Sequence, residues 1–151
     1  MVTKTWICDS CGKEISRVKN GWIEWLAAEQ KGGGAKGIRL VHNAQAATGK
    51  LGKGCQYGNK KSMKVLGSSM DYFLGANGLM KFLSLIAEGE LEKVDVLEMI
   101  KRLHIPGYEY SHKHFAKAIK NGVFEPTTKE SYYHLSDIKA TLDYMKIGRT
   151  F

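Results

Sequence analysis

The cysteines of this chain are few and unevenly placed, and their positions limit the possible folds more than any other feature. Cys8 and Cys11 form a C-x2-C pair near the start, and Cys55 is the third and last cysteine of the 151 residues. An odd number of cysteines does not suit a framework of disulfide bonds. Two thiols at C-x2-C spacing can instead point inward from one turn and bind the same ion.

A tetrahedral metal site needs two further ligands, and the N-terminal half offers two candidates. One is Cys55, and the other is His42, the only histidine in the first 100 residues. Tetrahedral thiolate and imidazole ligation favours zinc, and a full set of protein ligands is typical of a structural site. We therefore predict one structural Zn²⁺ ion bound by Cys8, Cys11, His42 and Cys55. The alternative is a buried cysteine and a surface histidine that bind no metal.

The N-terminal region also lacks the apolar residues that would stabilise it without such a staple. Residues 30–37 and 48–61 are rich in glycine and lysine and are too polar to bury a core. Strand-like runs are restricted to residues 21–26 and 38–42. So small an apolar set does not stabilise a module of about 60 residues alone, which makes a metal staple expected.

The excess of positive over negative charge lies entirely in residues 1–66. Residues 1–66 hold 12 Lys and Arg against 4 Asp and Glu, whereas residues 67–151 hold 11 of each kind. Between Lys31 and Lys64 there are 8 basic residues and no acidic one. Such a patch attracts polyanions through Coulomb forces and counterion release. The alternative is a solvated loop whose charge only keeps the protein soluble.

The remainder of the chain is predicted to be mainly helical. Helices are expected from Met70 to Gly89 with a break at residues 75–78, from Asp95 to Leu103, and over residues 111–120. A β-hairpin is expected at 123–135, followed by a last helix capped by Ser136. We therefore predict an α+β fold, with a zinc-stapled, β-rich module (residues 1–66) packed on a helical region (residues 67–151).

Two resemblances follow from these patterns. Residues 6–55 resemble a zinc knuckle or half of a treble-clef finger, because a C-x2-C turn precedes the strand of Trp22 and Trp25 and two distant ligands. Residues 96–104, 111–121 and 123–135 resemble the positioning helix, recognition helix and wing of a winged-helix domain. The second resemblance implies phosphate contacts from one helix face that carries Lys113, Lys117 and Lys120. The alternative is a solvated face of a domain that binds proteins.

Signs of catalysis are weak in this sequence. His42-Asn43 resembles the His-Asn pair of HNH nucleases, but no second histidine follows at suitable spacing, and His42 is already assigned to zinc. A phosphate-binding loop of the G-x-x-x-x-G-K-[ST] type is absent from the sequence. A thioredoxin-like redox pair would place C-x2-C before a long helix, which the sequence does not predict here. We therefore expect a binding protein rather than an enzyme.

Three functions remain open at this point. The first is a nucleic-acid-associated regulator, in which the basic side chains contact phosphates; these are Lys36, Arg39, Lys50, Lys53, Lys60, Lys61, Lys113, Lys117 and Lys120. The second is a protein-interaction adaptor, for example of a mobile element or a host-defence system, and the third, more remote, is a metal-dependent nuclease. The apolar runs are too short to span a membrane, and the N-terminal sequence does not resemble a secretory signal, so a cytoplasmic protein is expected.

Overall fold

The computed structural model describes residues 5–44, 46, 54–58 and 61–147. Every strand in the described part of the chain lies between residues 6 and 69, and the α-helices begin at residue 75. The predicted α+β class, with a β-rich N-terminal part and a helical remainder, is therefore confirmed.

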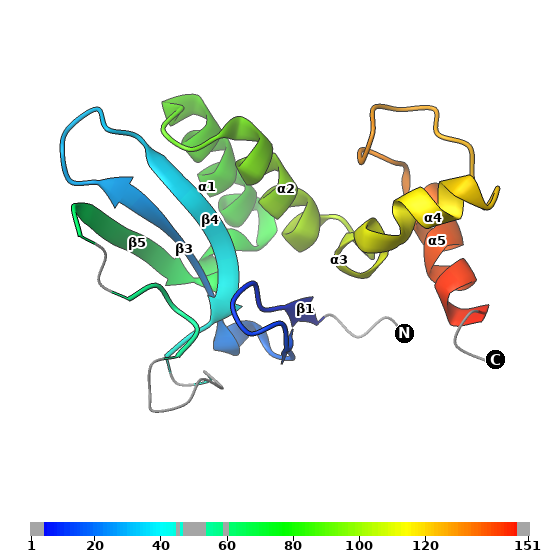
Figure 1. The fold of residues 1–151 in the computed structure, drawn as a ribbon, viewed down its shortest axis with the longest axis horizontal. Helices are drawn as coiled ribbons and strands as arrows, with labels where there is room; N and C mark the ends of the chain where they lie inside the picture. Colours follow the sequence, from blue (N-terminus) through cyan, green and yellow to red (C-terminus); the bar gives the residue numbers. More distant parts are fainter. Residues whose placement is uncertain (1–4, 45, 47–53, 59–60, 148–151) are drawn as a thin grey trace. The chain divides into compact units, whose positions relative to one another are not determined.

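A three-stranded antiparallel sheet forms the centre of the N-terminal part (Figure 1). Its middle strand is β3 (Gly21–Ala28), with β4 (Ala35–His42) on one side and β5 (Met63–Ser69) on the other. The strands predicted at 21–26 and 38–42 are confirmed and extend further. Strand β5 was not predicted, because Val65 and Leu66 stay exposed and the segment has no alternation of buried and exposed side chains.

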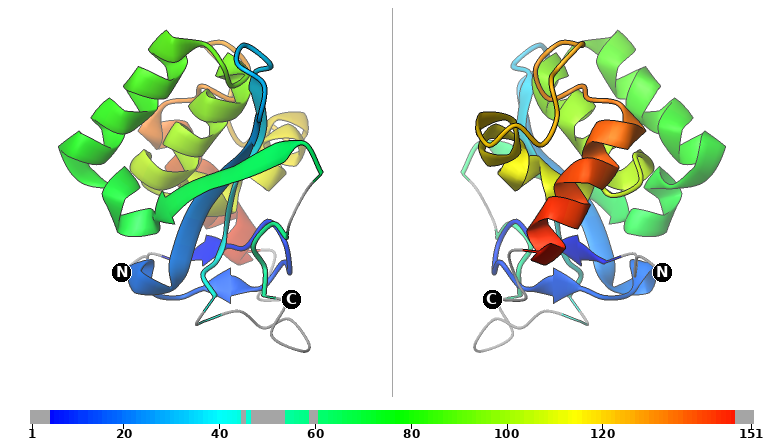
Figure 2. Two further views of the ribbon diagram at one scale, coloured as in Figure 1. Left: turned by 90° about the vertical axis from the view of Figure 1, so that its left-hand side faces the viewer. Right: turned by 90° about the vertical axis from the view of Figure 1, so that its right-hand side faces the viewer.

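The helices that follow the sheet cover one of its faces (Figure 2). A 3₁₀ turn (Met70–Phe73) leads into α1 (Gly75–Glu88), and α2 (Lys93–His104) comes next. Phe73 and Phe82 are fully buried in one core with Ile23 and Leu40 of the sheet. The sheet and these helices therefore share a single hydrophobic core.

The chain divides into two compact units between His104 and Ile105. Our predicted boundary between residues 66 and 67 differs from this division, and it falls inside strand β5. Leu66 and Gly67 both pair with β3, so a boundary at that point would divide one hydrogen-bonded strand. Helices α1 and α2 belong to the first unit because their apolar faces are buried against its sheet.

The break predicted at residues 75–78 falls at the start of this stretch, because Leu74 is extended and separates the 3₁₀ turn from α1. Gly75 has a left-handed φ of 67° and begins the helix. Gly78 is buried so close to Phe73 that a Cβ atom would lie 2.0 Å from the Phe73 carbonyl carbon. The predicted end is confirmed, since Gly89 has a φ of 74° and its N–H donates to the Leu85 carbonyl. Gly75 thus begins the helix, Gly78 allows it to approach the 3₁₀ turn closely, and Gly89 ends it.

The second unit contains only helices and loops in its described residues, 105–147. These are α3 (Tyr108–Ser111), a 3₁₀ turn (His112–His114), α4 (Phe115–Lys120) and α5 (Leu135–Ile147). The helix predicted at 111–120 is therefore present but starts earlier, and the last helix is confirmed.

The predicted hairpin at 123–135 is wrong, since residues 121–134 form no strand. Phe124 and Tyr133 instead pack on Phe115, with ring centroids 6.2 and 4.9 Å from that ring. The aromatic residues that suggested strands thus form a small core under α4. With no wing, and with residues 96–104 and 111–121 in different units, the winged-helix resemblance has no counterpart in the structure.

Candidate metal centre

The C-x2-C pair lies on a short hairpin. Strands β1 (Trp6–Ile7) and β2 (Glu14–Ile15) pair antiparallel, and the turn between them carries Cys8 and Cys11. The Cys8 N–H donates to the Lys13 carbonyl at 2.9 Å, and the Gly12 N–H donates to the Cys8 carbonyl at 3.0 Å. Gly12 has a φ of 75°, a conformation that glycine adopts without strain. Both cysteines therefore lie on one tight turn of a hairpin.

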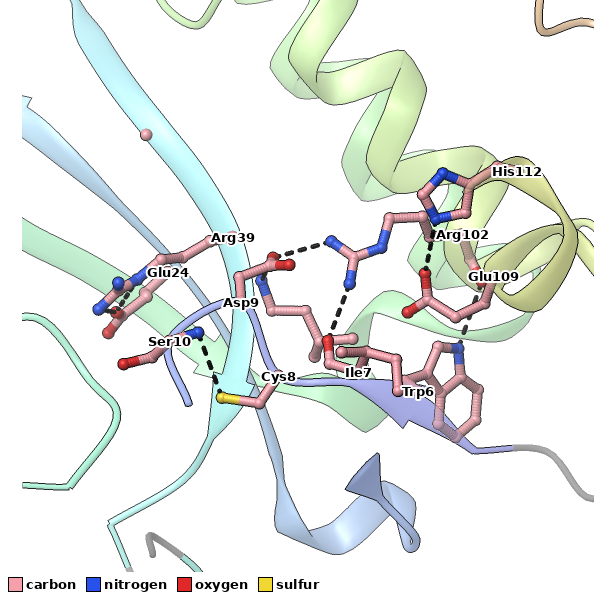
Figure 3. Close-up of polar contacts among 12 residues, drawn as sticks. Trp6, Ile7, Cys8, Asp9, Ser10, Glu24, Arg39, Arg102, Glu109 and His112 are labelled. Atoms are coloured by element: carbon pink, nitrogen blue, oxygen red, sulfur yellow. Dashed lines mark hydrogen bonds and ion pairs between the residues drawn. The ribbon is translucent and has the colours of Figure 1, made fainter. Parts of the chain in front are cut away.

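Backbone amides of the turn point at the first sulfur atom. The N–H groups of Ser10 and Cys11 lie 3.4 and 3.5 Å from Cys8 Sγ, and the Ser10 contact is drawn in Figure 3. Such donors stabilise negative charge on sulfur, which is the form that binds a metal. The turn therefore places two backbone donors at the sulfur atom of a candidate metal ligand.

The other two candidate ligands reach the same point from distant parts of the first unit. His42 is the last residue of β4, and its Nδ1 atom lies 3.4 Å from Cys11 Sγ and 3.7 Å from Cys55 Sγ. Cys55 belongs to the irregular segment 54–58. The four ligand atoms of Cys8, Cys11, His42 and Cys55 all lie within 4.8 Å of one another. All four residues predicted from the sequence are therefore brought together.

The spacing suits a tetrahedral ion. With Zn–S bonds of about 2.3 Å and Zn–N bonds of about 2.0 Å, the edges of a tetrahedron measure about 3.5–3.8 Å. The distances from His42 Nδ1 to the sulfurs of Cys11 and Cys55 match those edges. No disulfide bond joins the three cysteines, all of which lie among the described residues. A Cys3His group of this kind could bind zinc.

The second ring nitrogen of His42 fixes which nitrogen faces the thiols. Its Nε2 atom lies 3.0 Å from the carbonyl oxygen of Glu14, which can only accept a hydrogen bond. Nε2 must therefore carry the proton and Nδ1 present its lone pair to the centre. Metal-bound histidines characteristically have such an outer hydrogen bond, which orients the ring. This arrangement favours His42 as a true ligand.

The centre is largely closed to solvent. Cys8, Cys55 and His42 are only 1%, 2% and 5% exposed, and Cys11 is the one member that is not buried. Four protein ligands complete a tetrahedron, so no position would be left for a substrate or an activated water molecule. The arrangement therefore suits a structural ion.

Asp9, which the sequence reading missed, connects this turn to two other elements (Figure 3). Its Oδ2 atom accepts from the Leu40 N–H and from Arg102 Nη1, each at 2.8 Å, and its own N–H donates to the Leu40 carbonyl. Arg102 also donates to the Ile7 carbonyl at 3.0 Å. These contacts hold the hairpin against the edge of β4 and the end of α2. The one sequence feature that could have indicated these contacts is an acidic residue between the two cysteines of the C-x2-C pair.

The residues predicted to contact phosphates differ in their surroundings. Lys36 on β4 and Lys61 are exposed, as are Lys113, Lys117 and Lys120, which lie opposite the buried Phe115 and Ala118. Lys50, Lys53 and Lys60 lie outside the described residues. Arg39 differs from the expectation, because its guanidinium pairs with the buried Glu24 at 2.8 Å. Its charge is compensated within the fold, so we do not include it among the phosphate contacts proposed below.

Comparison with known proteins adds no assignment to this geometry. Scans of family models, curated proteins and solved structures found no match to the chain. None of the helices in the described residues has the length and apolar character needed to cross a membrane. The function is therefore inferred from the centre and its surroundings.

Proposed function

We propose that this protein binds nucleic acid and that a structural zinc ion in the Cys3His centre holds its basic N-terminal unit together. The observation that carries the proposal is the coincidence of two features in one stretch of chain. The four candidate ligands lie between residues 8 and 55, and the whole excess of positive charge lies within residues 1–66. The ion stabilises the fold, and the lysines attract phosphates.

The role of the ion follows from its ligands. Three thiolates and one imidazole suit zinc better than magnesium or calcium, which prefer oxygen ligands. With four protein ligands, the ion contributes binding free energy to folding, about 10 kcal/mol or more for zinc-finger peptides near neutral pH. That contribution would add to the hydrophobic core that the sheet of the first unit shares with α1 and α2.

The role of the lysines follows from their number and exposure. Lys36 and Lys61 are exposed on the N-terminal unit, and Lys50, Lys53 and Lys60 belong to the same acid-free stretch of sequence. Lys113, Lys117 and Lys120 form a second exposed group, although the unit that carries them has no wing. Contacts of this kind bind the phosphate backbone without reading its sequence.

The proposal is tested by measuring both the zinc content of the protein and its binding to nucleic acid. Purified protein should contain about one equivalent of zinc, and Cys8→Ser should lose it. Gel shifts with duplex and single-stranded probes should show binding that weakens steeply with salt, because each neutralised phosphate releases counterions. If four lysines act, the logarithm of the affinity for duplex DNA should fall by about 3–4 for each tenfold rise in salt.

Controls separate the two parts of the proposal. Reversal of Lys50, Lys53, Lys60 and Lys61 to glutamate should abolish binding while zinc content stays near one equivalent. A protein that contains zinc but binds no probe at low salt would retain the structural ion and refute the nucleic-acid function.

An adaptor for another protein is the second candidate, and one observation favours it. Tyr72, Met80 and Leu83 are 60%, 65% and 47% exposed on and beside α1, although they are large and apolar. Met80 and Leu83 are three residues apart and share one face of α1, and grouped exposed apolar side chains are typical of surfaces that bind proteins. This function predicts a partner that is captured after nuclease treatment and is retained when the lysines are reversed. Loss of the partner on Met80→Lys would support it.

A further inference from the structure

An ion pair with a buried carboxylate lies beside the candidate metal centre. Glu24 of β3 and Arg39 of β4 are directly opposite each other in the sheet, and the Glu24 side chain is completely buried. Arg39 donates from Nε to Glu24 Oε2 at 2.9 Å, and its Nη2 lies 2.8 Å from the same oxygen. A carboxylate at the middle of a sheet is costly unless it is paired in this way. Packing alone therefore does not explain a charged Glu24 side chain at this position.

The pair is joined to the segment that carries Cys55. Arg39 Nη2 donates to the Cys55 carbonyl at 2.9 Å, and the Tyr57 N–H donates to Glu24 Oε2 at 2.8 Å. The guanidinium carbon lies 3.6 Å from the centre of the Tyr57 ring. The Tyr57 hydroxyl donates to the Gly37 carbonyl at 2.8 Å. Segment 54–58 is thus attached to the sheet at Cys55 and again at Tyr57.

Cys55 needs such support more than the other candidate ligands. Cys8 and Cys11 are held by the hairpin of β1 and β2, and His42 ends a paired strand. Segment 54–58, in contrast, contains no helix or strand. Its attachment runs through a charged, planar guanidinium that can donate to two acceptors at once.

We propose that Glu24, Arg39 and Tyr57 form a clamp that positions Cys55 as a metal ligand and thereby sets the metal affinity of the centre. None of the three is itself a ligand. The inference rests on the proposed metal site and adds to it an outer shell that the ligand set alone does not reveal. Loss of such outer contacts typically lowers metal affinity by about 10- to 100-fold.

A cobalt titration tests this clamp. Metal-free protein under reducing, oxygen-free conditions is titrated with Co²⁺, whose absorption reports both tetrahedral geometry and the number of bound thiolates. Arg39→Met should weaken Co²⁺ binding by about 10- to 100-fold and reduce the thiolate-to-cobalt absorption, because Cys55 is no longer held in place. Lys36→Met is the matched control, since Lys36 is an exposed cation on the same strand, and its titration should equal that of the wild type.

Two further variants separate positioning from folding. Arg39→Lys keeps the positive charge but loses the planar guanidinium that donates to two acceptors. Compared with Arg39→Met, it should restore the wild-type circular dichroism spectrum but only part of the cobalt affinity. Glu24→Gln keeps the shape and an oxygen for the Tyr57 amide, and it should weaken cobalt binding even if Arg39→Met does not fold. Wild-type affinity and absorption in folded Arg39→Met or Glu24→Gln would overturn the clamp alone. Absence of cobalt binding by the wild type would overturn the metal site and the clamp together.

Discussion

At the scale of single residues, Asp9 illustrates how a ligand turn is fixed to the rest of its unit. It stands between the two cysteines of the C-x2-C pair, so its side chain is carried by the turn itself. One carboxylate oxygen accepts from a strand amide, at Leu40, and from a helix side chain, Arg102. The Arg102 side chain is only 10% exposed, so its charge depends on this partner. Asp9 therefore fixes the position of Cys8 and Cys11 without binding the metal.

Replacement of Asp9 should destabilise the first unit. Asp9→Ala removes the carboxylate oxygen that accepts from both Arg102 Nη1 and the Leu40 N–H, so we expect a loss of about 1–3 kcal/mol in unfolding free energy. The loss should be smaller than for a fully buried pair, because the Asp9 side chain is 33% exposed and water screens part of its charge. Urea denaturation of the metal-loaded protein measures the loss.

Two variants calibrate that measurement. Asp9→Asn retains an accepting oxygen and should lose less than Asp9→Ala. Ser10→Ala alters an exposed side chain in the same turn while keeping its amide, and it should stay within about 0.5 kcal/mol of the wild type. Equal stability of Asp9→Ala and Ser10→Ala would contradict the anchoring role.

At the scale of elements, α1 shows that the context of a glycine can reverse its usual effect. Gly78 lies inside the helix, where alanine is normally favoured by about 1 kcal/mol. Here the missing Cβ makes room for the backbone of Phe73, whose ring is buried in the core. The glycine is thus required by the close approach of the 3₁₀ turn to the helix.

We accordingly expect Gly78→Ala to destabilise the protein by about 1–3 kcal/mol, because the new methyl group would overlap backbone that has little freedom to move. Thermal denaturation followed by circular dichroism measures the change. Ser84→Ala, at an exposed position of the same helix, should instead be neutral or stabilise by up to about 0.5 kcal/mol. Stabilisation by both substitutions would show that the helix can shift away from the turn.

At the scale of the whole molecule, metal binding should affect the two units differently. All four candidate ligands lie in the first unit, and so do Trp6, Trp22 and Trp25, the only tryptophans of the chain. Tryptophan fluorescence therefore reports the unfolding of the first unit, whereas circular dichroism also includes the helices of the second. A ligand that binds only the folded state stabilises the unit that contains its site.

Removal of the metal with a strong chelator should lower the midpoint of the fluorescence transition by more than about 10 °C, since several kcal/mol of binding free energy are lost. The helical signal of residues 105–147 should respond less to the chelator than the fluorescence does, because this unit contains none of the four candidate ligands. Cys8→Ser should begin at the low midpoint and not respond to the chelator. An unchanged midpoint after confirmed loss of metal would refute the stabilising role of the ion.

The sequence by itself determined the members of the candidate centre. Cysteine and histidine are so scarce in the first 100 residues that one C-x2-C pair, one histidine and one cysteine left a single tetrahedral set, and the structure brings these four residues together. The strands at 21–26 and 38–42 were also predictable from their aromatic and β-branched residues, and most of the helices were predictable from the helical spacing of their apolar residues.

Only the tertiary structure decided how these parts are joined. Strand β5 forms because β3 offers it a hydrogen-bonding edge, and Phe124 and Tyr133 leave the expected hairpin because Phe115 offers them a core. Arg39 looked like a phosphate contact in a basic stretch, yet the fold places a buried carboxylate directly opposite it. In each case the deciding partner lies at least nine residues away, so no local pattern records it. The scarcity of cysteine and histidine in the sequence determines which residues can be ligands. The contacts that position those ligands depend on strand pairing and burial between residues far apart in the sequence.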